Sequence, residues 1–159
     1  MKRSHFGLML VGAFAMLTSM SMIASADDAK EAAIRKDRQR IAGTWRIVAL
    51  EINGNKSKDE DVRKMTVVNG ADGTWSLRSE GNEIVKGTST IDPTQNPKAI
   101  DLKPTTGEDQ GKSTLGIYEL GMKTRKLCIA SAGKSRPTEF TSTPENQQIL
   151  VTFEKEKTE

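Results

Sequence analysis

The sequence has little of what enzymes commonly use for catalysis. Its only histidine, His5, stands near the N-terminus, and its only cysteine is Cys128. One cysteine cannot form an intramolecular disulfide, so a fold of this chain has to be stabilised by packing. A lone cysteine without a basic partner is also a poor nucleophile. We interpret Cys128 as a small buried hydrophobic residue, with an intermolecular disulfide as the alternative.

Long apolar runs are absent beyond the first residues, and the one run present has the layout of an export signal. Lys2 and Arg3 precede an apolar core over Phe6–Leu17, and Ala24-Ser25-Ala26 is a small-x-small cleavage site. We therefore predict a signal peptide at 1-26. The alternative is an uncleaved anchor, but the apolar core is too short for a stable membrane-spanning helix. We expect an exported protein, periplasmic or extracellular, with no membrane span after signal cleavage.

Cleavage would remove His5 and leave residues 27–159, with 22 basic and 21 acidic side chains. A chain without histidine has no Ser-His-Asp or Cys-His catalysis and none of the usual zinc sites. A charge near +1 gives no bulk attraction to nucleic acid or to an anionic membrane. No phosphate-binding loop or dinucleotide fingerprint is present. We expect no enzyme activity, no catalytic residues, no metal and no cofactor.

Carboxylates remain as candidates for chemistry. Asp59-Glu60-Asp61 form a charged cluster that we interpret as solvated rather than as a cation site. Glu119 and Glu139 stand among apolar residues, and a glycosidase would need two such groups on opposite sides of a sugar. We favour structural roles instead. Strand alternation would turn Glu119 outward, and Glu139 would pair with Arg136 in a loop.

The chain changes character near residue 41. Residues 27-40 are charged and rich in helix formers, and we interpret them as a charged N-terminal helix or tether with a solvated basic face. Residues 41-159 form the predicted globular domain. Within it, Ser57–Lys64 begins with a Ser-x-x-Glu capping-box pattern and predicts a short helix.

The rest of the domain consists of short runs with alternating apolar residues, separated by turn signals about every ten residues. We predict about eight strands, at residues 44–53, 65–69, 74–80, 83–91, 98–102, 113–120, 125–131 and 148–155. Gly81-Asn82 is a two-residue hairpin signal, and a second hairpin is expected across 121–123. Short connections favour antiparallel neighbours, and closing the sheet removes its edges. The prediction is an all-β, antiparallel up-and-down barrel of about eight strands with a short N-terminal helix.

Both tryptophans follow Gly-Thr, as Gly43-Thr44-Trp45 and Gly73-Thr74-Trp75. The first one, at the start of the first strand after a helical turn, resembles the lipocalin signature. The resemblance implies that the glycine permits a tight bend and that Trp45 plugs the closed end of a lipocalin-like barrel, with Lys155 as the nearest basic cap. The Thr-Asp-Tyr motif and the disulfides of many secreted lipocalins are absent. Trp75 is expected to be an ordinary large core residue.

Three further motifs, 97–101 "PKAID", 116–120 "GIYEL" and 136–140 "RPTEF", together resemble a small lipocalin-like domain family of unestablished activity, abundant in planctomycete bacteria. The resemblance covers nearly all of the chain after residue 26. It implies the barrel and export, but it supplies no catalytic residues. Its signature positions here are Gly43, Trp45, Tyr118, Arg136 and Glu139.

Three hypotheses for function follow from the sequence. The first is non-enzymatic binding of a small apolar or amphipathic ligand in the barrel, with Arg136 as a candidate ligand contact at the barrel mouth; the alternative role of Arg136 is to lock the loop before the last strand. The second is a structural or protein-interaction module with a filled barrel, acting through its loops or through residues 27–40. The third is a carboxylate enzyme using Glu119 and Glu139. The sequence names no protein partner, ligand or oligomeric state.

Overall fold

The fold was analysed in a computed structural model that describes residues 25–157. Two helices and nine strands are present in this part of the chain. The helices are α1 (Ala26–Ile41) and α2 (Asp59–Val62). The strands are β1 (Gly43–Ile52), β2 (Asn55–Lys56), β3 (Met65–Asn69), β4 (Thr74–Ser79), β5 (Asn82–Asp92), β6 (Lys98–Pro104), β7 (Thr114–Leu120), β8 (Thr124–Ile129) and β9 (Ile149–Lys155).

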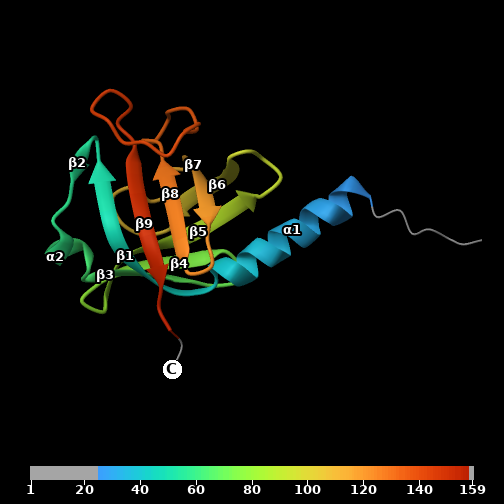
Figure 1. Ribbon diagram of the computed structural model, residues 1–159, viewed down its shortest axis with the longest axis horizontal. Coiled ribbons are helices and arrows are strands. Elements are labelled where there is room, and N and C mark those ends of the chain that lie inside the picture. Colours follow the sequence, from blue (N-terminus) through green and yellow to red (C-terminus); the bar gives the residue numbers. More distant parts are fainter. Residues whose placement is uncertain (1–24, 158–159) are drawn as a thin grey trace, which may run out of the picture.

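Eight of the strands close into an antiparallel up-and-down barrel (Figure 1). Strands β3 to β8 each pair with the next strand along the chain, and β1 pairs with β3 on one side and with β9 on the other. The predicted all-β barrel and its strand number are therefore confirmed. The additional strand β2 turns back onto β1 through Glu51 and Ile52. Its two residues lie outside the predicted strands, because a strand this short has no alternation to detect.

The predicted strand positions agree with the observed ones to within a few residues at each end, and β3 agrees at both ends. The β4–β5 hairpin lies one residue earlier than predicted. Ser79 pairs with Asn82, so the two turn residues are Glu80 and Gly81, with φ values of 51° and 83°. Two successive positive φ values match the twist of a tight hairpin, and glycine readily adopts the second.

Residues 26–41 form a continuous helix rather than a tether. Ser25 caps it by accepting a hydrogen bond from the Asp28 backbone N–H, and the Asp28 carboxylate accepts one from the Ser25 N–H. The helix projects from one end of the barrel (Figure 1) and contacts it mainly through its C-terminal part, with Lys30 as a further contact. The predicted signal peptide falls almost entirely on residues 1–24, which lie outside the described residues.

Helix α2 lies within the predicted segment but is shorter. Its N-cap is Lys58, which makes no side-chain capping bond, so the expected capping box at Ser57 is not formed. Val62 is the buried residue of this turn and anchors it against the barrel. Neither helix of the described region is long and apolar enough to cross a lipid bilayer.

Two ends of the barrel can now be distinguished. We call the end where α1 enters β1 the base, and the opposite end, where β1 turns into β2 and β8 leads to residues 130–148, the mouth (Figure 1). Gly43 joins α1 to β1 at the base with a φ of 109°, a conformation that side chains with a Cβ rarely adopt. The tight bend predicted for this glycine is therefore present.

Candidate ligand-binding site

The inside of the barrel is not filled by its side chains. A cavity of about 290 Å³ lies between the strands. Its wall consists almost entirely of aliphatic and aromatic side chains from alternate positions of the strands, such as Ile47, Val67, Leu77, Leu102 and Val151. Apart from the indole N–H of Trp75, the polar side chains of this wall are those of Asn69, Ser89 and Arg125. A closed sheet with so few aromatic residues leaves the space of one small molecule at its centre.

The mouth of the barrel has an apolar edge. Ile52, Ile149 and Ile129 occupy one register row across β1, β9 and β8, and all three line the cavity. Ile52 is 40% exposed, so it presents apolar surface at the strand end. An apolar rim leading into an apolar cavity offers a continuous path to a ligand of the same character.

The base of the barrel is closed by Trp45, which is only 1% exposed. Its indole Nε1 donates a hydrogen bond of 2.7 Å to the carbonyl oxygen of Ile41, the last residue of α1. Lys155 lies over the same ring, with its Nζ 5.3 Å from the ring centroid, and donates to the Arg40 carbonyl. Trp45 is thus buried at the base, with the ammonium group of Lys155 over its ring.

A second cation at the base was missed by the sequence interpretation. Arg125, on β8, is 5% exposed and stacks between Phe153 and Trp45, its Cζ lying 4.3 and 5.1 Å from the two ring centroids. Its Nη1 donates a long hydrogen bond of 3.3 Å to Oδ1 of Asn69. Its Nε is buried without a hydrogen-bond partner among residues 25–157. Burial lowers the pKa of Arg125 to about 10, because a charge removed from water is destabilised.

Helix α1 is fastened to the base by a separate polar cluster. Asp37, 3% exposed, accepts hydrogen bonds at Oδ2 from Lys98 Nζ at 2.7 Å and from the Tyr118 hydroxyl at 2.8 Å. Burial, with Asp37 as acceptor, raises the pKa of Tyr118, so the phenol keeps its proton. Arg38 and Arg40 also donate to the barrel, so the basic face of α1 is not simply solvated, as had been expected.

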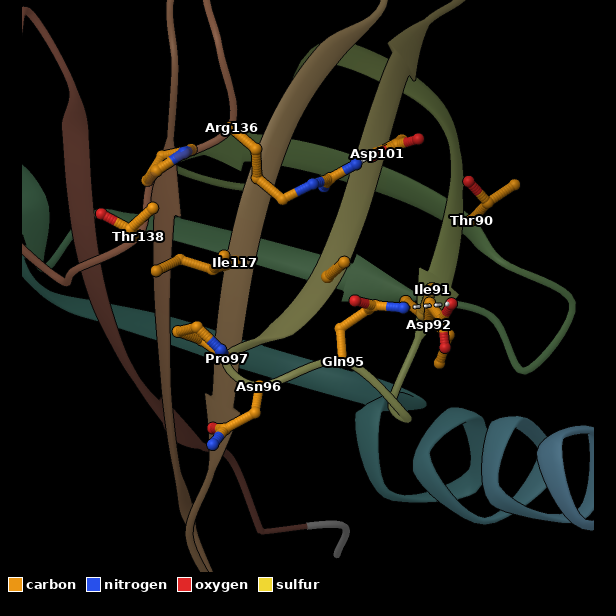
Figure 2. A pocket seen from close by; sticks show the side chains of 12 residues that line it. Thr90, Ile91, Asp92, Gln95, Asn96, Pro97, Asp101, Ile117, Arg136 and Thr138 are labelled. Atoms are coloured by element: carbon orange, nitrogen blue, oxygen red, sulfur yellow. Dashed lines mark hydrogen bonds and ion pairs between the residues drawn. The ribbon is translucent and has the colours of Figure 1, made fainter.

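Arg136, the predicted ligand contact, lies on the outer surface of the barrel and not at its mouth. Residues 130–148 cross over β6 to β8, and Arg136 extends from them toward Asp101 (Figure 2). Its guanidinium donates to the carbonyls of Ile100 and Gly116, and its Nη2 lies 2.7 Å from Oδ1 of Asp101. This pairing replaces the expected pair with Glu139, whose side chain is exposed. The contacts match the loop-locking role considered for Arg136.

The same outer surface carries a groove of about 450 Å³ beside Arg136 (Figure 2). The groove is larger than the interior cavity, but its charged side chains are already paired with other groups of the protein. Arg136 has the partners given above, and Asp92 accepts from Lys30 at 2.8 Å and from Thr94 at 2.6 Å. The groove therefore offers a ligand little unsatisfied polarity and little enclosed apolar surface, and we place the candidate site inside the barrel.

The other predicted residues lie away from the cavity. Glu119 is exposed, and neither it nor Glu139 lines the interior, so the structure does not bring these two carboxylates together across a bound sugar. Cys128 is fully buried, with Sγ 3.3 Å from the Thr141 carbonyl, and burial raises the pKa of its thiol. Trp75 is half-buried in the cavity wall and donates to the Thr88 carbonyl.

Comparisons with known proteins gave no match: no protein-family model, no curated protein and no solved structure is significantly similar to this chain.

Proposed function

We propose that this protein is a non-enzymatic, exported binding module that holds one small, mainly apolar molecule inside its barrel. The observation that carries the proposal is the interior cavity of about 290 Å³, with its aliphatic wall, closed base and apolar mouth. The lipocalin resemblance of Gly43-Thr44-Trp45 supports the same function, and the export signal expected at residues 1–26 supports the location. A module that acted only through a filled barrel would have no use for this space.

The size of the cavity limits the ligand. An engineered protein cavity of about 150 Å³ holds one benzene molecule, so a cavity of about 290 Å³ accommodates a ligand of about a dozen non-hydrogen atoms. This excludes haem, carotenoids and long-chain lipids as fully enclosed ligands. It favours short acyl chains and molecules with one or two rings.

The proposal is tested by filling the cavity. Val67 lines the interior from β3, whereas its neighbour Val68 points to the outer surface. A Val67→Phe variant should lose binding of octanamide, a neutral probe of suitable size, while a Val68→Phe variant should retain it. Binding is measured by isothermal titration calorimetry and by the fluorescence of Trp75, which borders the cavity.

Native mass spectrometry of the protein purified from its own host would identify a natural ligand retained in the barrel. A retained small molecule of the expected size supports the proposal. Absence of octanamide binding to the wild-type protein, or equal binding by the two phenylalanine variants, would contradict it.

A further inference from the structure

We propose that the cavity is selective for a small carboxylic acid, whose carboxylate is bound at the base of the barrel by the guanidinium of Arg125 while its apolar body fills the space toward the mouth. This inference rests on the binding function proposed above and specifies its ligand class. It starts from the one charged side chain that the strands direct into the apolar interior.

Arg125 is placed where a structural charge would be costly. In the described region, no acidic side chain lies within ion-pair distance of it. The lowering of its pKa has burial as its cause, with no compensating carboxylate. Stacking on Trp45 and Phe153 stabilises the cation through the faces of the rings. It leaves the N–H groups in the plane of the guanidinium, and these need an acceptor.

Apart from the second amide N–H of Asn69, the unused donors of the cavity wall belong to Arg125. Ser89 accepts from Arg38 and donates to the Gly73 carbonyl. Asn69 donates to the Val67 carbonyl and accepts from Arg125. The guanidinium has five N–H groups, of which only one on Nη1 has an acceptor within residues 25–157. A carboxylate can accept two of the others in a bidentate pair and neutralise the charge.

The cavity sets the rest of the ligand. Arg125 lies beside Phe153 and Trp45 at the base, whereas Ile52, Ile129 and Ile149 line the other end near the mouth. A ligand bound through its carboxylate therefore places its apolar end toward the rim. With about a dozen non-hydrogen atoms, the ligand is a medium-chain fatty acid or an aromatic carboxylic acid rather than a long-chain one.

Two probes of equal shape separate the contribution of the charge from that of the cavity. Octanoate and octanamide differ in charge but carry the same chain. We expect the wild-type protein to bind octanoate at least about tenfold more tightly than octanamide, as a buried charged hydrogen bond would give. The Arg125→Met variant should bind both with equal affinity. Lys126→Met removes a cation from the next residue of β8, which is exposed, and should keep the wild-type preference.

A direct signal comes from NMR of the wild-type protein, which remains informative even if Arg125→Met does not fold. The Nε–Hε resonance of Arg125 should move on addition of octanoate and remain in place on addition of octanamide. Equal affinity of wild type for the two probes would overturn the carboxylate inference and leave the binding function standing. A preference that survives in Arg125→Met would also overturn it. Failure of both probes to bind wild type would overturn both proposals.

Discussion

Replacing Trp45 by alanine should destabilise the protein far more than the same change at Trp75, although both residues follow Gly-Thr. Removing a buried tryptophan from a core costs about 3–5 kcal/mol. Trp45 is 1% exposed, and its loss also leaves the Ile41 carbonyl without its donor, which adds about 1 kcal/mol. We expect a loss of about 5 kcal/mol. Trp75 is half-buried beside an existing cavity, and its loss should cost about 2 kcal/mol.

Urea denaturation followed by far-UV circular dichroism measures both losses without relying on tryptophan fluorescence. With a slope of about 1–3 kcal/mol per molar urea, the Trp45→Ala midpoint should fall by about 2 M or more relative to wild type. Because a small domain has only about 5–15 kcal/mol of stability, Trp45→Phe serves as a milder variant that still folds. Equal midpoint shifts at the two positions would refute the assignment of Trp45 as the plug that closes the base.

Three other changes test the base and the outer loop. Asp37→Ala removes the buried carboxylate that holds α1, and we expect a loss of about 2–4 kcal/mol in urea denaturation, somewhat below a fully buried pair because its lysine partner is 37% exposed. Arg136→Ala should increase the rate of proteolysis within residues 130–148, measured by limited digestion and mass spectrometry, without changing octanamide affinity. Acidification should loosen the helix, because hydrogen bonds from Lys30 and Thr94 lower the pKa of Asp92 below its ordinary value of 3.8. As the pH falls, Asp92 is protonated in the unfolded chain before it is protonated in the folded protein. The stabilisation by the ionised Asp92 carboxylate is therefore present above pH 3.8 and is lost as the pH falls below it. Thermal unfolding at graded pH should show a smaller loss of stability in Asp92→Asn than in wild type.

Most of the barrel could be predicted from the sequence because its strands are half-buried. Alternation marks such strands clearly, as in β9, where Ile149, Val151 and Phe153 share one face. Turn residues then divide the chain at regular intervals. The short strand β2 was not predictable in this way, since it is stabilised by pairing with β1. The sequence also left open whether residues 27–40 form a helix or a tether, because α1 is held by bonds from Asp37, Arg38 and Arg40 to the barrel.

The candidate site was only partly predictable. Alternation in "TRKLCI" places Arg125 on the same face as Leu127 and Ile129, and this is the signal that could have identified an inward charge. It was overlooked because an arginine near a hairpin is usually solvated. Arg136 was noticed for its proline-flanked motif, but a sequence pattern does not say on which side of a barrel a loop folds back. Only the structure shows that residues 130–148 lie over the outer surface.

The pairing of β1 with β9 has a consequence for how the chain folds. The two strands lie about a hundred residues apart in sequence, and together they complete the ring of hydrogen bonds. Contacts of such high sequence separation slow folding, because a long stretch of chain has to be ordered before they form. The barrel cannot close while its last strand is still being synthesised. Until β9 is added, β1 and β8 both lack the strand that joins them, so the sheet stays open.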